Sequence, residues 1–141
     1  DLSLLDKMTD SEGNLIKDFT PEATGHVDIA DSTWDAVHQG MRAVITDGSV
    51  SKIFKDLEVE IAGKTGTAQE SRTRGNHAFF ISYGPYTNPE ICVTVNIPYG
   101  YSSSNAAMVA KNVYRFYYGY TDLESILGSG ALEVSNVKVG D

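Results

Sequence analysis

Three short runs of alternating apolar and polar residues, separated by a few turn-forming residues, restrict most strongly how this chain can fold. The runs cover residues 57–69, 76–84 and 90–98. In the first run, Leu57, Val59 and Ile61 alternate with glutamates, so one face of a strand is buried and the other is wet. Short connections can join antiparallel neighbours but not parallel ones. The sequence therefore predicts a three-stranded antiparallel meander.

Two amphipathic segments flank these strands and predict helices that pack on the sheet. The first covers residues 33–46 and has Asp31 or Ser32 as its cap. The second covers residues 105–118, with Ser104 or Asn105 as its cap. Its apolar positions at helical spacing are Ala106, Val109, Val113, Phe116 and Tyr117. The eight tyrosines of the chain, among them Tyr114, Tyr117 and Tyr118, are expected to pack between helix and sheet.

The order of elements predicts an α+β fold, in which helices flank an antiparallel sheet. A hairpin over residues 2–19 comes first, and a loop or short turn around residues 49–56 separates the first helix from the strands. Residues 120–141 contain three glycines and no clear period, so we expect a weakly ordered tail.

Composition narrows the possible functions. The chain of 141 residues has a formal net charge of -8, which argues against nucleic acid as a partner. A single cysteine, Cys92, excludes an internal disulfide and makes a thiolate zinc site untenable; we expect it to be a small buried filler. Three histidines lie on separate segments, so no shared metal site is expected: His26, His38 and His77.

The stretch "IAGKTGTAQE" at residues 61–70 places a cation, two hydroxyls and a residue without a side chain in a row. Strand alternation puts Thr65 and Thr67 on one side and Lys64 on the other. An extended ligand could pair with such a strand at its edge, and the ammonium and hydroxyls could bind its carboxylate. The stretch is typical of a site for an anionic, peptide-like substrate, although an ordinary solvated strand end has a similar composition.

The surroundings of this stretch resemble a known family. From "STWDAVHQGMRAVITDG" through "FKDLEVEIAGKTGTAQ" to "NHAFFISYGPYTNPEICVTVNIPYG", the chain resembles the transpeptidase domain of class B penicillin-binding proteins, and "AGKTGTAQ" is similar to that family's third active-site motif. The helix "SNAAMVAKNVYRFYY" continues the resemblance, which covers residues 1–119. It implies that these residues are the C-terminal portion of a transpeptidase domain.

The resemblance implies an enzyme that cross-links peptidoglycan through an acyl-serine intermediate. Lys64 would then be catalytic, while Thr65, Gly66 and Thr67 would bind the substrate, with the Thr67 N–H in the oxyanion hole. The implied ligands are the D-Ala-D-Ala stem peptide and β-lactam antibiotics, and no cofactor is implied. The implied location is the outer face of the bacterial cytoplasmic membrane, through an N-terminal anchor helix that is absent from this chain.

The family's other two motifs, Ser-x-x-Lys and Ser-x-Asn, should lie upstream of the third. Strings of this spelling occur at Ser49–Lys52, Ser135–Lys138 and Ser103–Asn105, and we reject them because they fall in a loop, in the tail and at a helix cap. The nucleophile is therefore expected outside the chain, in an upstream half of the same domain that would be its partner. The chain begins at Asp1 without an initiator Met, which fits a segment, and alone it should be inactive.

Two alternatives remain open from the sequence. A non-catalytic sensor that binds β-lactams or muropeptides could retain the same strand, and so could a β-lactamase. The loop "ESRTRGN", which carries Arg72 and Arg74, is expected to be mobile beside the pocket.

Overall fold

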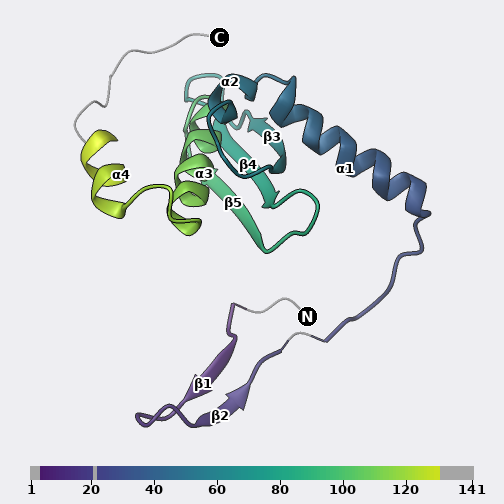
Figure 1. The fold of residues 1–141 in the computed structure, drawn as a ribbon, viewed down its shortest axis with the longest axis vertical. Coiled ribbons are helices and arrows are strands. Elements are labelled where there is room, and N and C mark those ends of the chain that lie inside the picture. Colours follow the sequence, from purple (N-terminus) through teal and green to yellow (C-terminus); the bar gives the residue numbers. More distant parts are fainter. Residues whose placement is uncertain (1–3, 21, 131–141) are drawn as a thin grey trace. The chain divides into compact units, whose positions relative to one another are not determined.

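The computed structural model describes residues 4–20 and 22–130 (Figure 1). The chain forms two compact units, Asp1–Thr33 and Trp34–Asp141, which are described separately below. The first unit contains β1 (Lys7–Thr9) and β2 (Leu15–Asp18), and α1 (Asp31–Thr46) begins at its end. The second unit then contains, in chain order, α2 (Ser51–Phe54), β3 (Ala62–Ala68), β4 (His77–Gly84), β5 (Ile91–Ile97), α3 (Ser103–Tyr117) and α4 (Leu123–Gly130).

The first unit is an exposed hairpin of β1 (Lys7–Thr9) and β2 (Leu15–Asp18), paired antiparallel. Its turn is held by the Asp10 carboxylate, which accepts hydrogen bonds from the backbone N–H groups of Glu12 and Asn14, both at 2.9 Å. Gly13 has φ 88°, a left-handed conformation that glycine adopts without strain. The predicted hairpin is therefore confirmed, with strands shorter than the range 2–19.

The sheet of the second unit is the predicted meander. Its strands are β3 (Ala62–Ala68), β4 (His77–Gly84) and β5 (Ile91–Ile97), in the order β3-β4-β5 with both pairs antiparallel. The first strand begins later than predicted. Residues 57–61 alternate between half-buried or buried apolar residues and exposed glutamates, as expected, but they pair with no strand in the described sheet.

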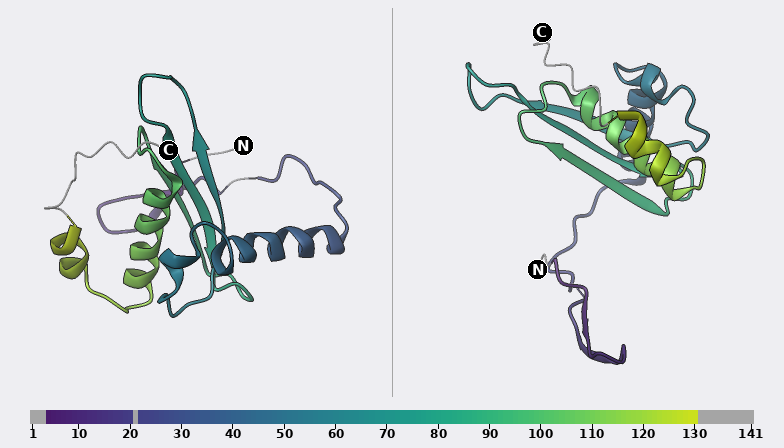
Figure 2. Two further views of the ribbon diagram at one scale, coloured as in Figure 1. Left: turned by 90° about the horizontal axis from the view of Figure 1, so that it is seen from above. Right: turned by 90° about the vertical axis from the view of Figure 1, so that its left-hand side faces the viewer.

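Helix α3 (Ser103–Tyr117) packs against all three strands and forms the second layer of this unit (Figure 2). It begins at the cap residue Ser102, whose hydroxyl accepts from the Ser104 N–H at 3.3 Å, two residues before the earliest predicted cap. It ends before Gly119, as predicted, where φ is 73°.

The buried face of α3 differs from the predicted one. Ala106, Ala107, Ala110 and Tyr114 are fully buried, whereas Val109 and Phe116 are 44% and 51% exposed. Small alanine side chains let the helix backbone approach the sheet closely, so the larger apolar residues lie on its flank. The predicted packing of Tyr114 is correct, while Tyr117 is 53% exposed.

Helix α1 (Asp31–Thr46) contacts the core only near its C-terminal end. Ile45 is buried there, but Trp34 and Val37 are 46% and 48% exposed. The helix starts at the predicted residue Asp31. The prediction that its apolar stripe packs along the sheet is therefore wrong for its first half in this chain.

Two further helices lie where no helix was predicted. A single turn, α2 (Ser51–Phe54), carries the buried Phe54, whose ring stacks on Phe80 of β4 at 5.5 Å. Helix α4 (Leu123–Gly130) follows Asp122, whose carboxylate accepts from the Ser125 N–H at 2.6 Å. This helix lies within the range 120–141, and residues 131–141 lie outside the described residues.

Candidate functional site

The "GKTGTA" stretch lies on β3, an outer strand of the described sheet. One edge of β3 pairs with β4, from Ala62 opposite Tyr83 to Ala68 opposite His77. The other edge pairs with no strand among the described residues. An edge without a strand partner is the kind of edge that an extended ligand can pair with by β-addition.

The two faces of β3 carry different chemistry. Thr65 lies opposite Phe80 and Thr67 opposite Ala78, residues that are fully buried on the side of α3. Lys64 lies opposite Ile81, which is 47% exposed on the other face of the sheet. The predicted separation of the ammonium from the two hydroxyls is thus present in the strand.

The cation of Lys64 is turned along its own strand. Its Nζ donates to the carbonyl oxygen of Thr65 at 2.6 Å, and the residue is exposed. Thr67 is also exposed, and Thr65 is half-buried. The ammonium and the hydroxyl of Thr67 are therefore open to solvent and accessible to a ligand.

Glycines in β3 allow close packing against β4. A Cβ on Gly63 would lie 2.7 Å from Cζ of Phe80, and one on Gly66 would lie 3.3 Å from Cβ of Phe79. The first distance is shorter than van der Waals contact allows, so Gly63 is required where β3 crosses the core.

The loop between β3 and β4 ends in a polar cluster. Glu70 Oε2 lies 2.9 Å from His77 Nε2 and accepts from the Tyr99 hydroxyl at 3.1 Å. Arg74 donates to the Tyr99 hydroxyl at 3.0 Å and lies over its ring. The prediction of a mobile loop did not anticipate these contacts, and Glu70 and Tyr99 were not singled out. The sequence signal was weak, because the partners are up to 29 residues apart.

Two of the three strings that are spelled like the family's other motifs lie in described residues. Ser49 is exposed in a turn before α2, and Lys52 lies within α2. Ser103–Asn105 form the first turn of α3, after its cap. Ser135–Lys138 lies outside the described residues.

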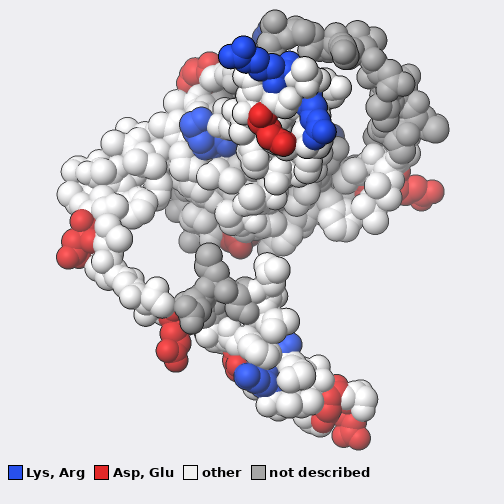
Figure 3. All heavy atoms as spheres, turned by 180° about the vertical axis from the view of Figure 1, so that it is seen from behind, with Lys and Arg blue, Asp and Glu red and all other residues white. Residues whose placement is uncertain are grey.

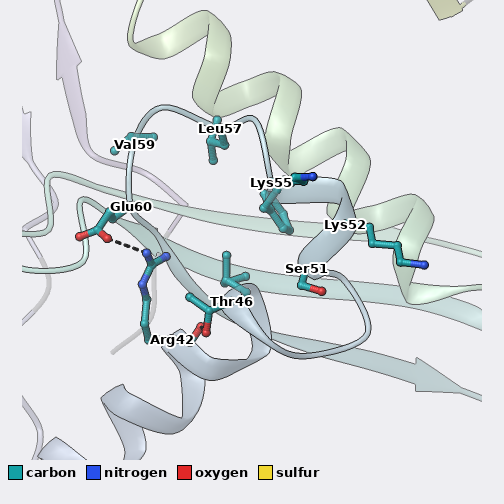
Figure 4. Close-up of a pocket in the computed structure, with 10 residues that line it drawn as sticks. Arg42, Thr46, Ser51, Lys52, Lys55, Leu57, Val59 and Glu60 are labelled. Carbon is teal, nitrogen blue, oxygen red and sulfur yellow. Dashed lines mark hydrogen bonds and ion pairs between the residues drawn. The ribbon is translucent and has the colours of Figure 1, made fainter.

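A hollow of about 530 Å³ lies beside the start of β3 (Figure 4). Arg42 crosses it, donating to the carbonyl oxygen of Ile61 at 2.8 Å and to the Glu60 carboxylate at 2.7 Å. Lys52 and Lys55 also line it, but residues 64–67 do not. The hollow is thus distinct from the exposed edge of β3, which carries the motif.

Histidines and acidic residues do not gather into a metal site in the described part of the chain. His26 lies 3.1 Å from Asp28, His38 packs against Tyr83, and His77 binds Glu70. Basic and acidic side chains are interspersed on the face shown in Figure 3. None of the described helices is long and apolar enough to cross a bilayer.

Cys92 is exposed, so the prediction of a buried filler is wrong. Val93 faces α3 and is 7% exposed, and the alternation of β5 turns Cys92 to the opposite face. Because the described part of the second unit leaves that position of the sheet uncovered, the thiol reaches solvent.

Comparison with known proteins identifies the family. The profile described as "Penicillin binding protein transpeptidase domain" matches residues 1–115. The chain belongs to the penicillin-binding protein transpeptidase family. The class B resemblance and the α+β fold predicted from sequence are both confirmed.

Relatives and solved structures agree with this assignment. The peptidoglycan D,D-transpeptidase MrdA of Haemophilus influenzae is 36% identical over 103 residues, which cover 61% of this chain and 16% of that protein. The crystal structure of Pseudomonas aeruginosa PBP2 in complex with WCK 5153 has a TM-score of 0.61 at 34% identity, covering 75% of this chain and 24% of that one. Penicillin-binding protein 2B of Streptococcus pneumoniae has a TM-score of 0.62 at 25% identity, covering 81% and 20%. The chain spans 14–16% of the length of the curated relatives it matches.

Proposed function

We propose that this chain is the C-terminal segment of a peptidoglycan D,D-transpeptidase and that β3 is its substrate-binding strand. The observation that carries the proposal is the position of Lys64–Thr67 on an exposed strand edge, within a chain that belongs to the transpeptidase family. The stem peptide, which ends in D-Ala-D-Ala, would extend along that edge. β-Lactams would bind the same strand as mimics of the dipeptide.

Each motif residue has a role in this proposal. Lys64 supplies a positive charge that orients hydroxyl groups, and its ammonium is accessible. Thr65 and Thr67 hold the substrate carboxylate, and Gly66 lets the substrate backbone approach. The N–H of Thr67 faces the oxygen that becomes negatively charged when the acyl carbon is attacked. Donors placed in advance stabilise such a charge because they need no reorganisation during the reaction.

The nucleophile belongs, in this proposal, to an upstream half of the same domain. Large exposed apolar residues in the second unit support such a partner, among them Trp34, Val109 and Phe116 at 44–51% exposure. Together the two halves would bury these side chains. The complete enzyme would act at the outer face of the cytoplasmic membrane, held by a helix outside this chain.

The test is the rate at which the full-length enzyme forms a covalent adduct with a fluorescent penicillin. Lys64→Ala should slow acylation by about 10²- to 10³-fold, the usual effect of removing a positioned donor at such a site. Lys55→Ala removes an exposed lysine outside β3 and is the matched control. Acylation of Lys64→Ala at the wild-type rate would contradict the proposed role of the strand. Rapid release of hydrolysed penicillin would instead indicate a β-lactamase.

A second measurement concerns the 141-residue chain alone. Covalent catalysis needs a serine activated by a neighbouring base. We expect no stable penicilloyl adduct on the chain, measured as intact mass after denaturation. A stoichiometric mass increase that maps to Ser49 or to another serine of the chain would refute the proposal that the nucleophile lies upstream.

A further inference from the structure

Three residues outside the K-T-G-T motif form hydrogen bonds that connect the end of β3 to residues distant in sequence. Glu70 follows Thr67 by three positions, and His77 is the first residue of β4. Glu70 Oε2 lies 2.9 Å from His77 Nε2, and it also accepts from the Tyr99 hydroxyl at 3.1 Å. Tyr99 follows β5, so the contacts join all three strands at one end of the sheet.

His77 makes a hydrogen bond through each of its ring nitrogens. The backbone N–H of Tyr99 donates to Nδ1 at 3.3 Å. The tautomer that fits this bond carries its ring proton on Nε2, which lies toward the Glu70 carboxylate. A hydrogen bond from His77, and a second from Tyr99, lower the pKa of Glu70, in keeping with an ionised carboxylate. The imidazole thus bridges a carboxylate and a backbone amide, and each ring nitrogen has a partner.

The turn that carries Tyr99 is held in an uncommon conformation. Tyr99 and Tyr101 have φ values of 54° and 65°, which residues other than glycine rarely adopt. The Tyr101 N–H donates to the Asn76 carbonyl oxygen at 2.9 Å, and a Cβ on Gly75 would lie 3.1 Å from the Tyr101 ring. Such strain persists only when the surroundings hold it. The close contact with residues 75–77 is what holds this turn.

We propose that Glu70, His77 and Tyr99 form an anchor that fixes the C-terminal end of β3 and positions Thr67 for substrate. The inference rests on the proposed function of β3. His77 pairs with Ala68, next to Thr67 opposite Ala78, so an anchor at His77 acts on the strand one residue away from Thr67. The three are positioning residues: they act through the backbone of β3 and do not contact the reacting atoms.

The experiment uses the full-length enzyme and two independent measurements. Hydrogen exchange of the backbone amides in residues 66–77 reports whether the anchor holds the strand. Penicillin acylation, resolved into binding affinity and limiting rate, reports whether Thr67 is positioned. Glu70→Ala removes the carboxylate, and Glu90→Ala is the matched control, because Glu90 is an exposed glutamate directly before β5.

Two substitutions of His77 separate its contacts. His77→Gln places an amide donor near the position of Nε2 and keeps the bond to Glu70. His77→Asn places an acceptor near the position of Nδ1 and keeps the bond from Tyr99. Each should restore part of what His77→Ala loses. If His77 only filled space, the recovery in these two variants would not depend on which hydrogen bond each of them keeps.

In Glu70→Ala and His77→Ala we expect faster exchange of these amides and a limiting acylation rate about tenfold lower, since small misplacements near a reacting centre are costly. Penicillin affinity should change much less than the limiting rate. Unchanged exchange in both variants would overturn the anchor. Faster exchange with an unchanged limiting rate would overturn the positioning role and leave the proposed function intact. A wild-type enzyme that forms no adduct would overturn the proposed function, and the positioning role with it.

Discussion

Replacement of Tyr114 by phenylalanine tests the polar contact that joins α3 to the sheet. Tyr114 is fully buried, and its hydroxyl donates to Ser82 Oγ at 3.0 Å. Ser82 in turn donates to the carbonyl oxygen of Val93 at 3.3 Å, so one chain of hydrogen bonds crosses α3, β4 and β5. Phenylalanine keeps the ring and removes one oxygen. We expect the free energy of unfolding to fall by about 1 kcal/mol, the usual net value of such a bond.

The same substitution has a second, pH-dependent consequence. Burial raises the pKa of Tyr114 from 10.0 to about 12, against the smaller opposing effect of the bond to Ser82. Below pH 10, tyrosine is neutral in both the folded and the unfolded state. Between pH 10 and 12 the unfolded chain ionises first, so stability falls as pH rises. At about 1.4 kcal/mol for each unit of pKa, the shift amounts to about 3 kcal/mol. In Tyr114→Phe this part of the loss should be absent.

The measurement is urea unfolding of the purified chain, followed by circular dichroism at neutral pH and through the range from pH 10 to 12. Burial also raises the pKa values of Tyr83 and Tyr118, so the difference between wild type and Tyr114→Phe isolates Tyr114. Tyr101→Phe, at a residue that is 51% exposed, is the control and should change stability by less than about 0.5 kcal/mol. An alkaline loss in Tyr114→Phe equal to that of wild type would refute the reasoning.

Four further substitutions test the packing of β3 and the contacts just before its start. Gly63→Ala should lower stability by about 1–3 kcal/mol, because its Cβ would lie 2.7 Å from the Phe80 ring, and Gly66→Ala should cost less at 3.3 Å from Phe79. Equal thermal midpoints for the two variants would contradict this packing. Arg42→Met should cost about 1–2 kcal/mol, since it removes donors to the Ile61 carbonyl oxygen and to Glu60. Glu60→Gln should cost less, in the same thermal assay, because the bond to Ile61 remains; a larger loss in Glu60→Gln would show that the carboxylate dominates.

The alternation of residues was enough to predict three antiparallel strands, their order and the position of the motif on the first of them. Alternation is a local property, because successive side chains in a strand point to opposite faces whatever the strand pairs with. Val93 is therefore buried and its neighbours in β5 alternate as expected. For the same reason, Lys64 and Thr65 could be assigned to opposite faces of β3 before any partner strand was known.

The sequence did not predict which surfaces are buried or where strand pairing begins, because both depend on the elements that meet in the fold. Leu57 and Val59 continue the alternation of β3, yet pairing with β4 begins only at Ala62, opposite Tyr83. On α3, hydrophobicity favoured Val109 and Phe116, but close approach to the sheet selected the alanines and Tyr114. Burial depends on which surface meets the element, and the periodicity of a helix does not contain that information.

The same distinction applies to the candidate site, of which one part could be predicted from the sequence and the other could not. The motif is a run of four consecutive residues, Lys64–Thr67, so it could be recognised directly in the sequence. Glu70 and Tyr99 are 29 residues apart, and they meet His77 only because β3 and β5 end at the end of the sheet where β4 begins. Contacts between residues distant in sequence depend on strand pairing and on the turns that follow it. For this reason the motif could be recognised in the sequence, whereas the side chains that position its strand could not.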